Sequence, residues 1–401
     1  MPESGPTILQ IVPQLDAGGA ELSAIEIAEA LAVAGARAEV FTEGGRMAAR
    51  VTEVGGILMP FPAATKNPVR IVANARRLAA HVRETGVAAL HARSRAPAWS
   101  AYLAARWTRR PFITTYHGAY NERTALKRWY NGVMARGDIV IANSAFTRDL
   151  IIARYGTDPA RIRVIYRGVD PAVFDPAAIA PQRVAELRAG WGVAPGRPVV
   201  LLAARLTAWK GQAVLIDAAA ELARSGRLGD AVVVLAGDHQ GRDGYVDDLD
   251  RQVRALGLEG HVRRVGHVGD MPAAFAAAAV TVVASTEPEA FGRSAAEAQA
   301  MGCPVIATAI GAPPETVAAA PADPATGWLI PPSAAEPLAA ALAEALTMTP
   351  QRRAAMSQAA RARVIQRFSL DAMKRATLAV YDEVLATRLL TAYTQRRGPP
   401  A

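Results

Sequence analysis

The sequence predicts an α/β protein with two successive domains, each built on a doubly wound parallel sheet. The chain has 401 residues, and a single hydrophobic core usually stops growing at ~250–300 residues. Short apolar segments alternate with helical patterns along most of the chain, which is typical of βαβ units. These apolar segments are continuous rather than alternating, for example at 139–142, as expected for strands covered on both faces.

The first half is predicted to contain seven strands separated by helical segments. We expect them at 7–13, 38–42, 56–61, 87–91, 111–117, 138–143 and 163–166. An amphipathic helix at 22–33 ends at Gly35. A proline-rich stretch at about 170–195 then interrupts the alternation, and we place the junction between the domains there.

In the second half the alternation begins again. Strands are expected at 198–203, 231–236, 262–265, 280–284 and 303–307. From Pro350 the pattern is helical, and apolar residues at 370–390 recur at helical spacing. We therefore expect an N-terminal domain at 1–178, a C-terminal domain at 179–369 and a terminal helix at 370–401 that packs back on the N-terminal domain.

The composition limits the classes of protein that fit. Hydrophobic residues make up 51% and Cys303 is the single cysteine, which excludes an intrachain disulfide and a zinc site built on several cysteines. The net charge of +9 favours anionic partners, but the basic residues are dispersed and no nucleic-acid motif is present. The N-terminus does not resemble a signal peptide, and no apolar run reaches the ~18–20 residues needed to cross a bilayer. A cytoplasmic location is expected.

The strongest functional pattern lies around Glu289 and Glu297. Glu289 follows the strand at 280–284, and a helix is predicted to begin near Phe291 or Gly292. Ligands bind at the carboxyl ends of strands in open α/β sheets, and the free N–H groups of a helix N-terminus suit a phosphate. Glu289 lies just before this helix, and Glu297 lies over a turn into it. Both carboxylates are therefore placed to accept hydrogen bonds from ligand hydroxyls.

A second pattern follows the strand at 198–203. Arg205 and Lys210 lie between this strand and a helix that begins near Gln212, so both cations are expected at the same sheet edge. A diphosphate leaving group needs such charge when no metal supplies it. No Asp-x-Asp element follows a strand, so no metal site is predicted.

Taken together, these residues resemble a known family. Arg205 with Lys210, Glu289-x7-Glu297 and the segment from Met301 to Val305 are similar to the C-terminal half of family-4 retaining glycosyltransferases of the GT-B fold. The early loop Gly18-Gly19-Ala20-Glu21 and the linker Arg167-Gly168-Val169-Asp170 resemble the same family. This resemblance implies two Rossmann-like domains that face a cleft.

The resemblance also implies roles in binding a nucleotide-sugar donor. Arg205 and Lys210 would bind the diphosphate and stabilise its departure, and Glu297 would contact the ribose. Glu289 would bind hydroxyls of the transferred sugar. The remaining donor contacts implied are Gly18 and Gly19 of the first loop, Ala290, Phe291 and Gly292 before the helix, and Gly266, His267 and Val268 near the base.

His117 matches the histidine that the family places near the anomeric centre. The family's members usually retain the anomeric configuration and need no tightly bound metal. The resemblance therefore implies a UDP- or GDP-linked sugar as substrate and no separate cofactor.

The region at 118–136 concerns the acceptor. Leu126, Trp129, Tyr130, Val133 and Met134 fall on one helical face, with Arg123, Lys127 and Arg128 off that stripe. This pattern predicts a core-packed helix with a solvated basic face. The alternative is peripheral contact with an anionic inner membrane. The same region resembles bacterial enzymes that build lipopolysaccharide or other surface polysaccharides, which implies a glycan or lipid-linked acceptor.

Other interpretations remain open at this point. Glu289 and Glu297 could be solvated helix carboxylates, Arg205 and Lys210 could be surface charges, and His117 could be a structural histidine at a strand end. The alternative functions are a sugar-nucleotide epimerase of the same fold and a non-catalytic nucleotide-sugar-binding protein.

Overall fold

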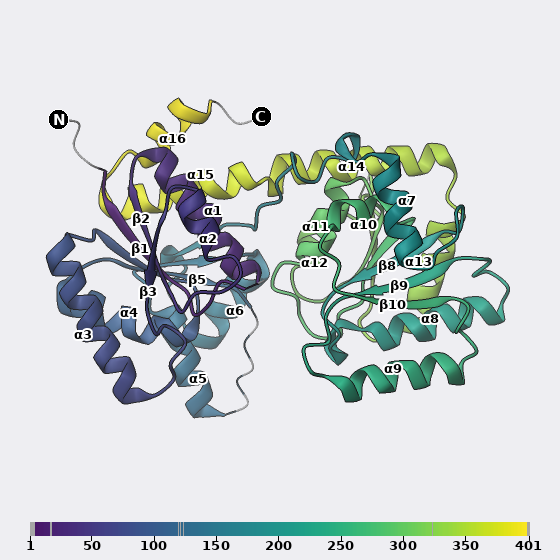
Figure 1. The fold of residues 1–401 in the computed structure, drawn as a ribbon, viewed down its shortest axis with the longest axis horizontal. Coiled ribbons are helices and arrows are strands. Elements are labelled where there is room, and N and C mark those ends of the chain that lie inside the picture. Colours follow the sequence, from purple (N-terminus) through teal and green to yellow (C-terminus); the bar gives the residue numbers. More distant parts are fainter. Residues whose placement is uncertain are drawn as a thin grey trace. The chain divides into compact units, whose positions relative to one another are not determined.

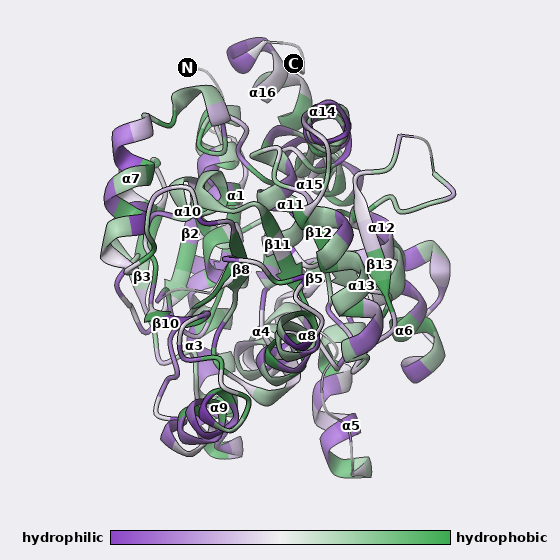
Figure 2. Cartoon of the chain, turned by 90° about the vertical axis from the view of Figure 1, so that its right-hand side faces the viewer, coloured by the Kyte–Doolittle hydropathy of each residue, from purple (hydrophilic) through white to green (hydrophobic). Residues whose placement is uncertain are grey.

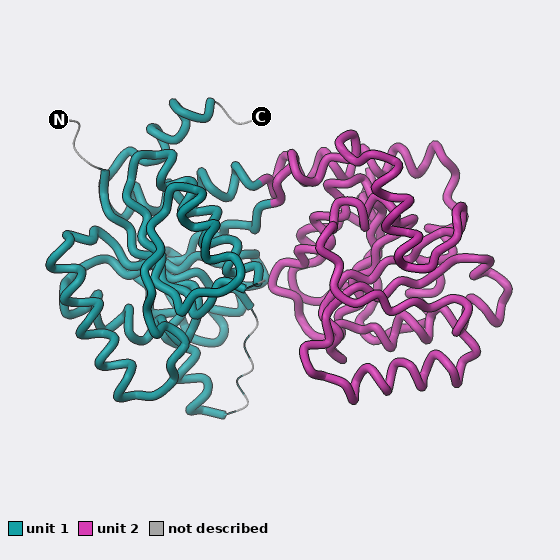
Figure 3. The backbone as a smooth tube through the Cα atoms, viewed as in Figure 1, with its two compact units in different colours: residues 1–168, 370–401 teal, residues 169–369 magenta. Residues whose placement is uncertain are grey.

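The chain forms two compact units, which are coloured separately in Figure 3. The computed structural model describes residues 5–398 apart from residues 17, 119, 121, 123 and 323. Unit 1 combines Met1–Gly168 with Leu370–Ala401, and unit 2 is Val169–Ser369. Among the described helices none is long and apolar enough to span a membrane.

Unit 1 is built on a seven-stranded parallel sheet with the order β3-β2-β1-β4-β5-β6-β7 (Figure 1). The strands are β1 (Thr7–Ile11), β2 (Arg37–Thr42), β3 (Ile57–Pro60), β4 (Ala89–Ala92), β5 (Phe112–Tyr116), β6 (Ile139–Ala142) and β7 (Ile162–Val164). The strand order reverses between β1 and β4, which makes this position the switch point of the sheet.

Helices cover both faces of this sheet. They are α1 (Gly19–Ala34), α2 (Ala49–Glu53), α3 (Pro68–Thr85), α4 (Arg95–Thr108), α5 (Ala125–Asn131), α6 (Ala145–Tyr155), α15 (Leu370–Leu385) and α16 (Leu389–Arg397). Successive residues of a strand point to opposite faces. Accordingly, Ile8 packs in a core with residues of α1, α15 and α16, whereas Leu9 packs in a core with residues of α3 and α4.

Unit 2 repeats this topology in a six-stranded parallel sheet. Its strands are β8 (Val199–Ala203), β9 (Val232–Ala236), β10 (Val262–Gly266), β11 (Val280–Val283), β12 (Val305–Thr308) and β13 (Gly327–Ile330). The order β10-β9-β8-β11-β12-β13 places the reversal between β8 and β11.

The helices of unit 2 also lie on both sides of its sheet (Figure 1). They are α7 (Pro181–Gly190), α8 (Gln212–Arg224), α9 (Asp243–Ala255), α10 (Met271–Ala277), α11 (Arg293–Ala300), α12 (Pro313–Thr316), α13 (Ala335–Leu346) and α14 (Pro350–Phe368). Residues of α8, α9 and α13 share one core with the strands, and α14 packs on α11.

The last two helices belong to unit 1 and pack on α1. The hydroxyl of Tyr381 in α15 lies 2.7 Å from Nδ1 of His91, and both side chains are buried. Lys374 Nζ lies 2.7 Å from a carboxylate oxygen of Glu29 in α1. The final segment is therefore joined to unit 1 by buried polar contacts as well as by apolar packing.

The fold class predicted from the sequence is confirmed, with three differences in detail. β13 was not predicted, and the helix expected at 370–390 ends at Leu385, because Ala386 adopts a left-handed φ of 52°. The division between the units falls at Gly168/Val169 rather than near residue 178. Phe174 explains this, since its buried ring lies 6.3 Å from that of Phe275 in unit 2.

Candidate active site

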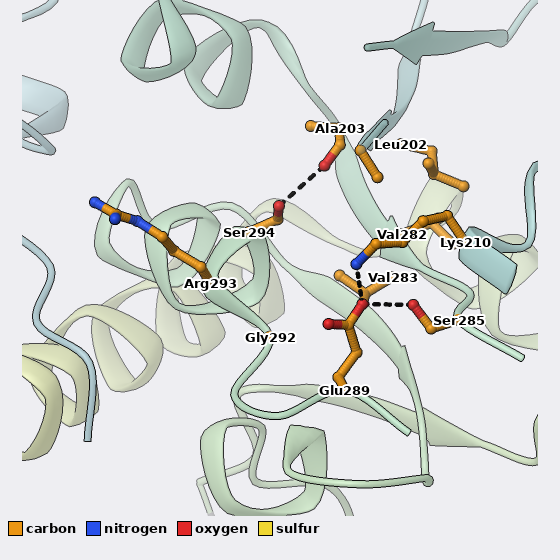
Figure 4. A pocket seen from close by; sticks show the side chains of 11 residues that line it. Leu202, Ala203, Lys210, Val282, Val283, Ser285, Glu289, Gly292, Arg293 and Ser294 are labelled. Carbon is orange, nitrogen blue, oxygen red and sulfur yellow. Dashed lines mark hydrogen bonds and ion pairs between the residues drawn. The ribbon is translucent and has the colours of Figure 1, made fainter. Parts of the chain in front are cut away.

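A pocket of about 140 Å³ lies at the switch point of unit 2, where β8 and β11 end (Figure 4). Leu202 and Ala203 of β8 line it together with Ala204, which follows that strand, and Val282 and Val283 line it from β11. The other lining residues follow these strands: Lys210, Ser285, Glu289, Gly292, Arg293 and Ser294. The sheet thus positions charged and polar groups at the edge where such folds bind ligands.

Lys210 and Glu289 form an ion pair in this pocket. Ser285 Oγ donates a second hydrogen bond of 2.6 Å to the same Glu289 oxygen, Oε1, and Figure 4 shows both side chains converging on it. Lys210 Nζ also lies 4.0 Å from the centre of the Trp209 ring. The backbone of Glu289 is fixed as well, since its carbonyl accepts a 2.9 Å hydrogen bond from the N–H of Ala312.

Gly211 allows the turn that carries Lys210 to approach the end of β11. Its φ is +75°, and a Cβ at this position would lie 1.9 Å from the carbonyl oxygen of Ala284. Only glycine tolerates both the left-handed backbone and this close contact. The position of Lys210 in the pocket therefore depends on Gly211.

Helix α11 begins at the pocket, with Gly292 as its N-cap at a φ of +81°. No side chain caps this end, and the positive end of the helix dipole points toward the pocket, where it favours an anion. Ser294 Oγ ties the first turn to the sheet through a 2.9 Å hydrogen bond to the carbonyl of Ala203. The N-terminus of α11 and Lys210 thus line the same pocket.

Glu297 is engaged with a neighbour on the same helix. Arg293 extends away from Glu289 (Figure 4), and its Nε lies 2.5 Å from Oε1 of Glu297. Burial raises the pKa of the Glu297 carboxyl, and the Arg293 guanidinium partly offsets this rise. The ion pair with Arg293 therefore holds the buried Glu297 carboxylate in one orientation.

Several residues implied by the family resemblance do not line this pocket. Arg205 is exposed, and its carbonyl accepts a 2.9 Å hydrogen bond from Gln212. Gly266, His267 and Val268 lie at the end of β10, which β9 separates from β8. Phe291 is buried with its ring 5.7 Å from that of Phe368, and neither Phe291 nor Ala290 is among the residues that line the pocket.

In unit 1, the residues that the family resemblance implied as site residues, among them Gly19 and His117, lie around Arg167. Its guanidinium donates to the carbonyl of Gly19, and Nη2 lies 2.7 Å from Nδ1 of His117. The backbone N–H of Gly18 donates a 2.9 Å hydrogen bond to the Glu21 carboxylate, which fixes the loop before α1. Arg167 thus connects the glycine loop with His117.

His117 is held as a neutral imidazole. Burial lowers its pKa well below the ordinary value, and Arg167 and Arg93 lower it further. Because Arg167 donates to Nδ1, the ring hydrogen must reside on Nε2. Nε2 is buried and has no hydrogen-bond partner in the described part of the chain, and His117 lines a cavity of about 20 Å³ together with Arg93.

Two family models match the chain in succession. Residues 17–173 match "Glycosyltransferase Family 4" and residues 184–363 match "Glycosyl transferases group 1". A D-inositol 3-phosphate glycosyltransferase from Jonesia denitrificans is 30% identical over 92% of this chain and 91% of its own length. The chain is a glycosyltransferase that combines a family 4 domain with a group 1 domain. This family assignment argues against the two alternative functions, the sugar-nucleotide epimerase and the non-catalytic binding protein.

A second relative of this glycosyltransferase matches part of its sequence more strongly. A D-inositol 3-phosphate glycosyltransferase from Kineococcus radiotolerans is 38% identical over 64% of the chain, and this match spans 59% of that relative's length.

Two solved structures are similar to the glycosyltransferase over almost its whole length. A glycosyltransferase from Rickettsia africae is 34% identical with a TM-score of 0.86, covering 96% of this chain and 100% of the other. HepE from Anabaena, solved in complex with UDP-glucose, is 27% identical with a TM-score of 0.81, covering 94% and 99%. These neighbours confirm the GT-B fold class.

The sequence predicted no individual role for four polar residues at the two sheet edges of the glycosyltransferase, although Arg167 was part of the linker that resembles the family. Ser285 and Ser294 line the pocket of unit 2, and Arg93 and Arg167 surround His117 in unit 1. Ser285 and Arg93 each come one or two residues after a central strand. A polar residue at the carboxyl end of a central strand was the signal that could have identified them.

The neutral state of His117 predicts a pH dependence of stability. The unfolded chain takes up a proton below a pKa of about 6.5, whereas the folded His117 does not, so stability is complete above about pH 6.5 and falls as the pH is lowered. Between about pH 7.5 and 5.5 we expect His117 to account for a loss of about 1 kcal/mol of unfolding free energy.

Urea unfolding of the wild type and of His117→Gln at both pH values measures this contribution. The variant is expected to lose less stability than the wild type on acidification. His239→Gln, which changes an exposed histidine, is the control and should behave as the wild type. An identical pH dependence in His117→Gln and the wild type would contradict the neutral assignment.

Proposed function

We propose that this glycosyltransferase transfers a hexosyl group from a UDP-linked sugar to a glycan or lipid-linked acceptor, with retention of anomeric configuration. The observation that carries the proposal is the Lys210–Glu289 ion pair beside the N-terminus of α11, in the pocket at the switch point of unit 2. This pocket joins a cation, the positive end of a helix dipole and a carboxylate, which match the diphosphate and hydroxyl groups of a nucleotide sugar.

Lys210 and the first turn of α11 are assigned to the donor diphosphate. Negative charge develops on the leaving phosphate as the bond to the sugar breaks, and preorganised donors aimed at that charge lower the barrier. Arg205, at the end of β8, supplies a second cation in the proposal. Its exposed side chain makes no ion pair with any described residue, so it is free to turn toward a bound phosphate.

Glu289 is assigned to the hydroxyls of the transferred sugar. Both of its side-chain contacts, from Lys210 and Ser285, reach Oε1, and Oε2 accepts no hydrogen bond from the described residues. A carboxylate oxygen that is fixed in position and unsatisfied suits a pair of sugar hydroxyls. Glu297 is assigned to the ribose and the backbone at 266–268 to the base.

Two considerations support a UDP-linked donor and a retaining reaction. HepE, which shares 27% identity with this chain, binds UDP-glucose, and the family resemblance implies retention without a metal. In the proposed step the bond from the anomeric carbon to the phosphate oxygen breaks, and the acceptor oxygen bonds to that carbon on the same face. The acceptor's proton passes to the leaving phosphate, so the step balances without a further reactant.

The acceptor is proposed to be an intermediate of lipopolysaccharide or another surface polysaccharide, reached at an anionic membrane. Leu126 and Trp129 of α5 are exposed beside Lys127, which supports contact with a lipid surface. A second candidate is an inositol phosphate, because the relatives at 30% and 38% identity are named for D-inositol 3-phosphate.

Replacing Glu289 by glutamine tests the donor assignment. Glu289→Gln is expected to keep UDP binding, because Lys210 and α11 remain, but to lower the rate of transfer from UDP-glucose by about 100-fold. Isothermal titration with UDP and release of UDP in the presence of EDTA measure the two effects. Glu287→Gln, which changes an exposed carboxylate of the same loop, is the control, and full activity of Glu289→Gln would refute the assignment.

A further inference from the structure

A second, larger hollow lies wholly in unit 1. This groove has a volume of about 1040 Å³ and is formed by residues before α3, at the start of α4 and along α5. Pockets for drug-sized ligands span ~300–1,000 Å³, so the groove can hold a molecule considerably larger than one sugar phosphate. The donor assignments in unit 2 do not use it.

One wall of the groove is apolar and exposed. Leu126 is 75% exposed and Trp129 is 55% exposed, and both line the groove. Trp129 is held in place because its ring stacks on that of Trp99, with the ring centres 4.5 Å apart. Val69, next to the lining residue Pro68, is 77% exposed.

This clustering is not typical of the molecule as a whole. Among the described residues six large apolar side chains are exposed, and three of them lie in or beside this groove. Figure 2 shows α5 with hydrophobic and hydrophilic residues on neighbouring turns. Apolar side chains gathered at a hollow mark an interaction site rather than the ordinary scatter of surface residues.

The groove is also cationic. Lys66, Arg95 and Lys127 line it, and no carboxylate does so among the described residues. Lys66 and Lys127 are exposed and form no ion pair in the described part of the chain. Arg95 is held over the Tyr120 ring, at 4.1 Å from its centre, and donates a 3.0 Å hydrogen bond to Asn131.

One polar group of the groove lacks a partner. The hydroxyl of Tyr130, a lining residue, is buried and makes no hydrogen bond to a described residue. A buried polar group without a partner is costly.

We propose that this groove binds the acceptor, and that the acceptor carries a phosphate or diphosphate joined to a hydrocarbon chain. The inference rests on the proposed transferase function and specifies the class of its second substrate. Lys66, Lys127 and Arg95 bind the anion, while Leu126 and Trp129 cover the hydrocarbon. A wholly polar acceptor such as an inositol phosphate would leave the apolar wall in water.

Geranyl diphosphate is a water-soluble probe of this chemistry. It is titrated by calorimetry into the full-length protein with UDP at saturation, so that the pocket around Lys210 is already filled. We expect it to bind at least tenfold more tightly than either inorganic diphosphate or geraniol. Trp129→Ala and the double variant Lys66→Gln/Lys127→Gln are each expected to weaken binding at least tenfold.

Two matched variants act as controls outside the groove. Trp107→Ala removes another exposed tryptophan of unit 1, and Arg76→Gln removes an exposed cation of α3; neither residue lines the groove. Both are expected to bind geranyl diphosphate as the wild type does. Weakening by these variants to the same extent as by Trp129→Ala would overturn the assignment.

The remaining outcomes are equally decisive. Equal binding of inorganic diphosphate would overturn the hydrocarbon part, and equal binding of geraniol would overturn the anionic part. Binding to vesicles that contain phosphatidylglycerol without binding of geranyl diphosphate would reassign the patch to the membrane surface. If UDP binds but geranyl diphosphate does not, this inference fails while the donor site stands; absence of UDP binding would instead refute the proposed function.

Discussion

Replacing Lys210 by alanine is expected to lower kcat/KM for transfer from UDP-glucose by about 10²–10³-fold, since the loss of one preorganised donor at a developing charge has an effect of this size. Lys210 lines the pocket of unit 2 together with Glu289, whereas the other lining cation, Arg293, is paired with Glu297 and Arg205 lies outside the lining. The variant also leaves the Glu289 carboxylate with Ser285 as its remaining side-chain donor. UDP affinity should therefore fall together with the rate.

The control for this variant is Arg254→Ala, which removes an exposed cation of α9 in the same unit. It should leave the rate and UDP affinity unchanged. Thermal unfolding of both variants shows whether the fold is intact. A Lys210→Ala protein that folds normally and retains wild-type kcat/KM would remove Lys210 from the mechanism.

Gly211→Ala is expected to have the largest effect on stability. An added Cβ would lie 1.9 Å from the carbonyl oxygen of Ala284 at a φ of +75°, so either the turn or the end of β11 must move. Strain together with a backbone clash places the expected loss of unfolding free energy for unit 2 at about 3 kcal/mol or more. Activity should fall as well, because the same movement displaces Lys210.

Gly226→Ala separates the clash from the backbone strain. Gly226 has a similar φ of +68°, but an added Cβ would meet nothing within 4 Å. It should therefore show only the left-handed penalty, about 1 kcal/mol. Urea unfolding followed by fluorescence gives the free energy of unfolding of both variants. Equal losses of this free energy would show that the clash with Ala284 does not contribute to the destabilisation.

The sequence was sufficient to predict the sheet edge that forms the candidate site. Lys210 and Glu289 each follow a strand that is recognisable from its continuous apolar run, and the rules of α/β folds bring the carboxyl ends of such strands together. The site geometry around His117 was not predictable in the same way. Arg167 meets His117 and Gly19 across long stretches of sequence, and no local pattern encodes those contacts.

The α5 region shows where helical periodicity fails. Five apolar residues at helical spacing predicted a core-packed helix, and this is wrong for Leu126 and Trp129, which are exposed. The α-helix ends at Asn131 and continues as a 3-10 turn at Gly132–Ala135, whose three residues per turn change the direction of the following side chains. Val133 and Met134 are buried as predicted; Arg123, part of the same pattern, lies outside the described residues.

Unit 1 is assembled from two stretches of chain that are separated by the whole of unit 2. Tyr381 of α15 closes over His91 in the interior of unit 1, so this core remains incomplete until the end of the chain has left the ribosome. Domains usually fold in their order of synthesis, but here the inserted unit 2 can complete its core first. A nascent chain stalled before residue 370 would therefore expose the unfinished face of unit 1 to chaperones and proteases, although most of its sequence would already have been made.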